Sequence, residues 1–534
     1  MKYNSTFSIS LIFIIFLCRF SIAQDSITNN RSDYSSDMIP ATAEIDVLNP
    51  LNYLDKATEW LSSSINNWIT QTVEDLKFAE TGTNIFRIYG RIRSRWEEQN
   101  NYDFDKNNYD LQHFQNHFIL FGISALTTEF RIDFEFYNAV EMFSTRINGM
   151  PDEDSWDIHR LTFMLTGFDN ERIRFPIPLT STREWADFLF YFGRGPITLG
   201  RGRIIGSNNW INKGDVFDEI VMSLILENSG ASLSFFGIRS IVYNDSIIND
   251  SEYGTEIWGV ALIGADPFDQ LDDVTELEQR GLLRPGQYDF DFFPANNSME
   301  HRSIIGIDIY ALWIYRDRND IESELGRVGN YNFANLGIRV GIELVSNWIF
   351  ELEGNYQLGK YGKSDLQAFA IHSELNGGFE WAIPVSFTAS VDYASGDSNP
   401  KDGIVETFYD VYGNIHSKFG KIDLFGWRNL LHLGFDLRFQ IANAVLISTG
   451  AHWLENAQMT DAIYGPRGTV FLEKGVGEPF KTIGSSFYTE LQYHYSKRIH
   501  LYSGVSYFQP GSKLTSVLLD DPVLQYYLIG EIRY

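Results

Sequence analysis

The sequence predicts an all-β fold: a transmembrane antiparallel β-barrel of about 18 strands, preceded by a short amphipathic helix. Three observations support this class. Apolar and polar residues alternate along most of the chain from Ile85 onward. This two-residue period is expected of a strand whose two faces meet different environments. The first 23 residues have the features of an export signal. The last residues also alternate, and the chain ends on the aromatic Tyr534.

Residues 1–23 are interpreted as a signal peptide. Lys2 gives a basic start, 11–17 is an apolar run, and Ser-Ile-Ala ending at Ala23 offers a small-x-Ala cleavage site. The only cysteine, Cys18, lies inside this segment, so the mature chain is expected to hold no disulfide. Lipidation of Cys18 is the alternative interpretation, but Leu17 is bulky for a lipid-attachment site.

The next two segments differ in composition. Residues 24–51 are rich in Ser, Asn and Asp and predict a disordered leader. Residues 52–80 predict an amphipathic periplasmic helix that lies on a barrel rim or at the membrane surface, and a plug inside the lumen is the alternative. Its apolar stripe has three- and four-residue spacing. The stripe consists of Leu54, Leu61, Ile65, Trp68, Ile69, Val73 and Leu76.

The barrel is predicted to occupy residues 84–534, beginning with a strand that carries four arginines on one face. Apolar residues from Phe86 to Trp96 take the other face. Charges facing hydrocarbon would cost roughly 2 to 4 kcal/mol each near the midplane, so the arginines are expected to face the lumen. No later run approaches the roughly 18 apolar residues of a spanning helix, so a membrane form must be a barrel.

The same alternation recurs downstream. Apolar residues at 130–136, 305–313, 338–344 and 348–356 oppose polar neighbours such as Asp133. A soluble sandwich also alternates, but the export signal and the abundant aromatic residues, 41 Phe, 28 Tyr and 12 Trp, favour a membrane barrel with aromatic girdles. Four polar stretches are predicted as long outer loops. They are Asn244–Tyr253, Asp266–Arg302, Asp317–Asn332 and Asn456–Lys481.

The charge balance excludes one class of partner. The chain has 70 acidic and 42 basic residues and a formal net charge of −28, so nucleic-acid phosphate would be repelled. Solvated acidic loops that keep the protein soluble explain most of this excess.

Two separated stretches carry a family resemblance. Residues 192–226 contain G-R-x-x-x-x-x-G-R-G-R-I-I-G followed by W-x-N-x-G-x-x-F-D, and residues 393–430 read YASGDSNPKDGIVETFYDVYGNIHSKFGKIDLFGWRNL. Both, in this order, resemble the alginate-export family of bacterial outer-membrane β-barrels. The resemblance implies an 18-stranded barrel in the outer membrane that passes an acidic polysaccharide out of the cell. The final aromatic strand resembles the signal read by the outer-membrane assembly machinery, and it should pair with the first strand.

A lumen for an anionic polymer needs fixed cations rather than a nucleophile. Guanidinium groups offset the lost hydration of carboxylates through bidentate contacts. The alternative is that each arginine pairs with a wall carboxylate, for which Glu351, Glu353, Glu343 and Asp133 are available. The predicted substrate-binding arginines are Arg87, Arg91, Arg93, Arg95, Arg131, Arg194, Arg201, Arg203, Arg339 and Arg428.

Catalytic, metal and cofactor sites are not predicted. The histidines have no serine or carboxylate partner at a recognisable spacing, and the sequence contains no G-x-S-x-G or H-E-x-x-H pattern. Asp397, Asn399, Asp402 and Glu406 could offer oxygen ligands to Ca²⁺, but their spacing is not that of an EF-hand, which favours a solvated turn.

The sequence therefore predicts a non-enzymatic outer-membrane channel, in contact with lipid, that exports an anionic, alginate-like polysaccharide. A general or substrate-specific porin for small solutes is the alternative, and a barrel whose loops bind a surface partner is a third class. Trp427-Arg428-Asn429 has two interpretations, a substrate contact or a girdle residue with a loop anchor.

Overall fold

We analysed a computed structural model of the chain. The chain divides into two units, Met1–Leu54 and Asp55–Tyr534, and the described residues all belong to the second. The predicted signal peptide, leader and amphipathic helix lie outside them. The structure describes residues 85–104, 111–126, 130–142, 154–166, 173–176, 183–208, 210–212, 214–226, 231–243, 249–252, 254–264, 305–322, 328–345, 348–380, 383–414, 416, 418–496 and 498–533.

The described residues form a ring of 18 long antiparallel strands, as predicted. In ring order the strands are β1 (Ile85–Asn100), β2 (Leu111–Leu126), β3 (Phe130–Met142), β4 (Asp154–Thr166), β6 (Arg183–Gly195), β7 (Phe217–Leu226), β8 (Ser232–Val242), β10 (Thr255–Ile263), β11 (Ile305–Glu322), β12 (Val328–Val345), β13 (Trp348–Tyr361), β14 (Ser364–Glu380), β15 (Pro384–Ala394), β17 (Leu430–Ala442), β18 (Val445–Asn456), β21 (Thr482–His494), β22 (Ile499–Pro510) and β23 (Val523–Arg533).

Short elements decorate the ring. They are β5 (Ile173–Pro176), β9 (Asp250–Ser251), β16 (Ile404–Val405), β19 (Ile463–Tyr464), β20 (Val470–Leu472), the 3₁₀ turn η1 (Pro466–Gly468) and the helix α4 (Ser512–Thr515). Among the described residues, no helix has the length and apolarity needed to cross a membrane.

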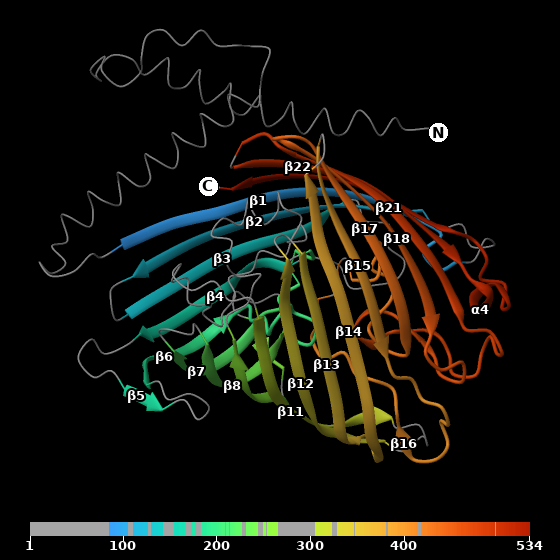
Figure 1. Ribbon diagram of the computed structural model, residues 1–534, viewed down its shortest axis with the longest axis horizontal. Helices are drawn as coiled ribbons and strands as arrows, with labels where there is room; N and C mark the ends of the chain where they lie inside the picture. The colour runs from blue at the N-terminus through green and yellow to red at the C-terminus, as the bar shows by residue number, and fades with distance from the viewer. Residues whose placement is uncertain are drawn as a thin grey trace, which may run out of the picture. The chain divides into compact units, whose positions relative to one another are not determined.

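The last strand closes the ring against the first, as the sequence predicted. β23 pairs antiparallel with β1 from Arg91↔Arg533 to Asn100↔Leu524, and Figure 1 shows the blue and red ends of the colour scale side by side. Closure pairs the backbone groups of both terminal strands, so neither strand presents an open edge.

The alternation predicted from the sequence divides the wall into two faces. On β11, Ile307 and Ile309 are 45% and 48% exposed on the outer face, whereas Asp308 between them is 2% exposed. Trp258 and Trp313 are paired across β10 and β11 on the outer face, and both are exposed. Apolar side chains therefore cover the outside of the barrel, and the charged side chains point inward.

The two rims differ in their connections. At the rim where β23 ends, two to four residues join β12 to β13, β14 to β15, β17 to β18 and β21 to β22. The connections that contain residues 196–216, 395–429 and 457–481 start at the opposite rim, which we name the long-loop rim. Figure 1 shows β5 and α4 at these opposite rims. Neighbouring strands run in opposite directions. The place of a strand in the ring order therefore determines at which rim it ends and at which rim the following connection begins.

One of the predicted outer loops was wrong, and another, Asp266–Arg302, lies outside the described residues. Asp317–Asn332 is mostly strand, because β11 runs to Glu322 and β12 starts at Val328. Its polar composition fits strands that continue past the hydrocarbon into water, where both faces tolerate polar side chains.

The main hydrophobic core lies inside the ring. Inward-facing Tyr310 and Phe333 pack with Ile204 and Ile205 from the β6–β7 connection and with Phe408 from the β15–β17 connection, and all five are buried. Two connections that start at the long-loop rim therefore fold back into the barrel and fill part of it.

A charge on the outer face should destabilise the barrel according to its depth. Ile309→Arg places a guanidinium among the outward apolar residues of β11 and should lower the free energy of unfolding by roughly 2 to 4 kcal/mol. Gln367→Arg, on the outer face of β14 near its rim, should change it by about 1 kcal/mol or less. Guanidinium-chloride unfolding in phospholipid vesicles measures both. Equal losses in the two variants would contradict the membrane orientation.

Candidate functional site

The candidate site is built from two connections that meet inside the barrel. We name residues 196–216 the first inner segment and residues 395–429 the second inner segment. They form a short parallel bridge at Ile205↔Tyr412. The amide of Gly206 donates to the carbonyl of Tyr412 at 2.9 Å, and the amide of Tyr412 donates to the carbonyl of Ile204 at 2.9 Å. The two stretches that carried the family resemblance are thus in direct contact.

Glycine makes this contact possible. A Cβ at Gly202 would lie 2.6 Å from Nδ2 of Asn414, and one at Gly206 would lie 2.3 Å from its Oδ1. Gly202 also has a φ of +69°, a conformation that favours glycine. The side chain of Asn414 occupies the space left by the missing Cβ atoms and accepts a hydrogen bond from the amide of Asn208 at 2.7 Å. The spaced glycines of the G-R-G-R-I-I-G motif therefore let the segments interlock.

Three arginines converge on one wall carboxylate. Arg339 donates to Glu351 at 2.8 Å from β12, and Arg203 donates to Glu351 at 3.4 Å from the first inner segment. Nε of Arg201 lies 3.9 Å from the same carboxylate. Glu351 has no exposed surface. We name Arg201, Arg203, Arg339 and Glu351 the arginine cluster.

Other wall carboxylates surround the arginine cluster. Arg339 donates to Asp308 at 2.9 Å. Arg203 lies 3.5 Å from Glu353 and 3.8 Å from Glu374. Each guanidinium is thus balanced by acidic side chains of β11, β13 and β14, which offsets the cost of burying its charge.

The first inner segment reaches across the lumen. Arg203 contacts the wall at β13, which is the eleventh strand of the ring counted from β1. Further along the same segment, Asn212 accepts a hydrogen bond from Arg93 at 2.6 Å, and the carbonyl of Trp210 accepts one from Arg95. Both of these arginines belong to β1. The segment therefore touches walls about half the ring apart.

The indole of Trp210 is held on several sides. His416 of the second inner segment stacks on it with ring centroids 3.7 Å apart. Tyr527 of β23 meets it edge-on at 5.5 Å, and the guanidinium of Arg95 lies 4.9 Å from its centroid. These contacts fix the far end of the first inner segment, so the indole cannot offer a free face to a sugar ring.

The second inner segment is fixed by its own polar contacts. Nζ of Lys418 donates to the carbonyl of Gly202 at 3.0 Å, and Gln357 of β13 donates to the carbonyl of Tyr409 at 2.8 Å. Burial, together with the charge of Arg203, lowers the pKa of Lys418 to about 7. Lys418 therefore changes its charge near neutral pH, inside the lumen.

The structure brings only some of the predicted arginines together. Arg201, Arg203 and Arg339 meet in the arginine cluster, and Arg93 and Arg95 hold the far end of the first inner segment. Their carboxylate partners include Glu351 and Glu353, which the sequence offered as candidates.

The remaining predicted arginines lie apart from the arginine cluster. Arg91 sits 4.9 Å from the ring centroid of Phe118. Arg131 pairs with Asp133 at 2.8 Å. The side chain of Arg87 lies outside the described residues.

Two further arginines have structural partners. Arg428 pairs with Asp410 and lies 4.2 Å from the ring centroid of Tyr409, so it acts as an anchor within the second inner segment. Arg194 donates to both carboxylate oxygens of Asp218, at 2.7 and 3.0 Å. Arg194 is 8% exposed, and its pairing with Asp218 places it apart from the arginine cluster.

The acidic turn considered for Ca²⁺ uses its carboxylates internally. Asp397 accepts a hydrogen bond from the amide of Asn399 at 3.1 Å, Asp402 accepts one from Ile404 at 2.9 Å, and Glu406 accepts one from Ser398 at 3.0 Å. In the part of the chain that the structure describes, no group of three potential metal ligands is assembled.

The sequence did not single out His372, Trp210 or Lys418. His372 and Lys418 contact the arginine cluster or the first inner segment, and Trp210 belongs to that segment. His372 lies two residues before Glu374 on the same buried face of β14, so the two-residue period of the strand could have predicted that it faces the lumen. Trp210 and Lys418 lie in connections, where no period applies.

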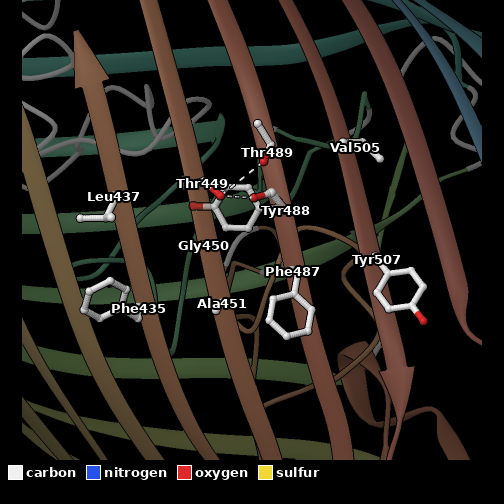
Figure 2. A pocket seen from close by; sticks show the side chains of 10 residues that line it. All are labelled: Phe435, Leu437, Thr449, Gly450, Ala451, Phe487, Tyr488, Thr489, Val505 and Tyr507. Atoms are coloured by element: carbon white, nitrogen blue, oxygen red, sulfur yellow. Dashed lines mark hydrogen bonds between the residues drawn. The ribbon is translucent and has the colours of Figure 1, made fainter.

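The outer wall carries a hollow of about 350 Å³ over β17, β18, β21 and β22. Figure 2 shows Phe435, Phe487 and Tyr507 around it. The hydroxyl of Thr449 donates to the carbonyl of Tyr488 at 2.8 Å and accepts from Thr489 at 3.3 Å. Because these hydroxyls are satisfied within the wall, the hollow suits lipid chains rather than a charged polymer.

Glu351 should be more important for stability than a surface carboxylate. Glu351→Gln removes the charge on which three guanidinium groups converge and should lower the free energy of unfolding by about 3 to 5 kcal/mol. The control is Asp365→Asn, whose side chain is 55% exposed and pairs with the equally exposed Lys360; its effect should stay within about 1 kcal/mol. Denaturant unfolding of refolded protein in detergent gives both values, and equal effects would argue against a tightly coupled cluster.

Comparison with known proteins gives the following matches. Residues 292–516 match the family model described as alginate export. Among solved structures, the chain is similar to OpdQ of Pseudomonas aeruginosa, with 9% identity and a TM-score of 0.51 over 84% of this chain and 97% of that chain. It is also similar to OccK2 (OpdF) of Pseudomonas aeruginosa in complex with glucuronate, with 10% identity and a TM-score of 0.48 over 84% and 97%. No curated protein matches the chain.

The likeness to OpdQ, at 9% identity, supports the barrel fold alone. The family match covers the second inner segment, and it confirms the resemblance that the sequence motifs indicated. The closed wall and its outward apolar rows place lipid around the barrel. The chain is therefore an outer-membrane β-barrel channel rather than an enzyme, and its residues 292–516 match the alginate-export family.

Proposed function

We propose that this channel passes an anionic, alginate-like polysaccharide out of the cell, and that Arg201, Arg203 and Arg339 contact the carboxylates of the polymer. One observation carries the proposal: three guanidinium groups converge on the carboxylate of Glu351, which has no exposed surface. A site that holds a protein carboxylate in this way has the charge and the donors to hold a uronate carboxylate.

Exchange of a protein carboxylate for a sugar carboxylate keeps each guanidinium paired during binding. Glu351, Glu353 and Glu374 keep the guanidinium groups paired while the lumen is empty. A sugar carboxylate that replaces one of them leaves each arginine with an anionic partner, and the displaced glutamate must then be hydrated in the opened lumen. A neutral sugar offers no such replacement, which makes the cluster selective for acidic residues of a polymer.

Passage of a polymer requires the inner segments to move. The first inner segment contacts walls on both sides of the lumen, at Glu351 of β13 and at Arg93 of β1. Polar contacts of this kind can be exchanged for water or substrate, whereas a fully apolar plug would lose hydrophobic burial when it moved. We infer that the two inner segments close the resting channel and are displaced together, because they share the bridge at Ile205 and Tyr412.

Removing charge from the arginine cluster should reduce selectivity for anions. In planar lipid bilayers, the wild-type channel should prefer anions and should be blocked by an alginate tetrasaccharide. The double variant Arg201→Gln, Arg203→Gln should bind the blocker at least roughly a hundredfold more weakly, since it removes two charge-assisted contacts of about 1.5 to 3 kcal/mol each. Zero-current potentials in a KCl gradient and the half-blocking concentration provide the measurements.

The matched control is Arg239→Gln, which neutralises an arginine that is 42% exposed and pairs with Glu256 at the rim. It should leave the block unchanged. Cation preference of the wild type would contradict the role of the arginines. Anion preference with equal permeation of small acids and no block by the tetrasaccharide would favour the alternative, a porin for small solutes.

We also propose that β23 is the segment recognised by the outer-membrane assembly machinery. It closes the barrel against β1, and the chain ends on Tyr534. Tyr534→Ala should lower the folded fraction in outer-membrane preparations, measured as the heat-modifiable band on gels, while refolding of the purified variant in detergent stays normal. Tyr507→Ala, an aromatic residue of the outer wall, is the control. Equal folded fractions in cells would overturn this proposal.

A further inference from the structure

A continuous row of polar contacts leads from the arginine cluster along the inner wall. Arg203 contacts Nε2 of His372, and Nδ1 of His372 lies 2.7 Å from Oδ1 of Asp392. The other oxygen of Asp392 lies 2.8 Å from Nδ1 of His432. Nε2 of His432 lies 2.9 Å from Nδ1 of His452. The row thus joins the first inner segment to four consecutive wall strands, β14, β15, β17 and β18.

The chemistry of arginine fixes the direction of these hydrogen bonds. A guanidinium has donors and no acceptor, so Nε2 of His372 must accept from Arg203 through its lone pair. His372 is then neutral, with its proton on Nδ1, and it donates to Asp392. Asp392 accepts from His372 and from His432, one histidine on each oxygen. The carboxylate therefore holds His372 in the tautomer that Arg203 requires.

Every element packed around His372 contributes a charged or titratable group. Glu351 of β13 and Glu374 of β14 both lie 3.8 Å from Nε2 of His372. Asp392 and His432 come from β15 and β17, as described above. From the inner segments come Arg203 and Lys418, and Lys418 lies within electrostatic reach of both Arg203 and Asp392. His372 is 1% exposed, so it meets these groups rather than bulk water.

We propose that His372 is a positioning residue for Arg203, and that the lone pair on its Nε2 keeps this guanidinium available to an anionic sugar. The inference rests on the proposed function, because it concerns the same arginine cluster. Neutral His372 gives Arg203 an uncharged acceptor, which leaves part of the guanidinium able to exchange carboxylates. Without this acceptor, Arg203 must bond fully to Glu351, Glu353 and Glu374, which lie 3.4 to 3.8 Å away, and it becomes less available to substrate.

Block by an alginate tetrasaccharide tests this role. The His372→Gln side-chain oxygen also accepts from Arg203, so this variant should keep the wild-type affinity. His372→Leu offers no acceptor and should bind the blocker roughly tenfold more weakly, which is the loss expected when a hydrogen bond to a charged group is removed.

Two control variants test neighbouring groups. His494→Leu removes another inward histidine, which contacts His500 rather than the arginine cluster, and it should keep the wild-type affinity. Lys418→Met removes a neighbouring ammonium group; the loss of affinity caused by His372→Leu should persist in this background. A His372→Leu channel with wild-type affinity would overturn the proposal.

Nitrogen NMR of ¹⁵N-histidine-labelled protein in nanodiscs tests the positioning independently of transport. The resonances assigned through His372→Gln should show a neutral ring protonated on Nδ1 at pH 7.5, and Arg203→Leu should shift the Nε2 resonance, because the ring loses its hydrogen-bond donor. A proton on Nε2 at pH 7.5 would overturn the inference. If the wild type is not blocked by the tetrasaccharide but these resonances behave as expected, the proposed substrate fails while the positioning of Arg203 by His372 stands.

Discussion

The hydrocarbon around the barrel is the constraint on which the rest of the structure depends. A charged side chain cannot face lipid at low cost, so each strand presents apolar residues outward and sends its polar residues inward. On β11 this separates Ile307 and Ile309 from Asp308. The inward charges then lie in a narrow space with little water, where each needs a partner. The convergence of Arg201, Arg203 and Arg339 on Glu351 is one consequence.

A second consequence is the way in which the lumen is filled. The inner segments bring apolar residues such as Ile204, Ile205 and Phe408 against inward Tyr310 and Phe333, so the barrel contains a hydrophobic core beside its ionic one. The apolar contacts stabilise the resting position of the segments. The polar contacts, at the arginine cluster and at Trp210, fix their register across the lumen. A channel that opens needs both, because apolar packing alone would not specify where each arginine lies.

The strand pattern made much of this fold predictable. Alternation correctly separated inward Arg93 and Arg95 from outward Ile92, and the closing pair of strands followed from the aromatic end of the chain. The inward folding of the connections did not follow, because a period of two describes strands and says nothing of where a loop goes. Asp317–Asn332 was wrongly assigned to a loop for a related reason: polarity indicates that a segment meets water, but a strand that extends beyond the hydrocarbon meets water as well. The pairing of Arg194 with Asp218 near the end of β6 did not follow from the strand period either.

The acidity of the chain is compatible with an anionic substrate once local and total charge are separated. The net charge of −28 counts every residue, whereas a polymer in the lumen interacts mainly with groups within a few ångströms, because water and salt screen the distant ones. At the arginine cluster the polymer meets three guanidinium groups that are paired with Asp308, Glu351, Glu353 and Glu374, and in the proposed exchange its carboxylate takes the place of one of these wall carboxylates.

A bare ring of arginines would be costly to bury without partners, and it would hold a polyanion too tightly to release it. Arginines that already carry protein carboxylates avoid both difficulties. Each step of a polymer then exchanges one carboxylate for another, with Glu351, Glu353 and Glu374 available to take the arginine back. The acidic residues that seem to oppose an anionic cargo are, in this arrangement, what lets it leave.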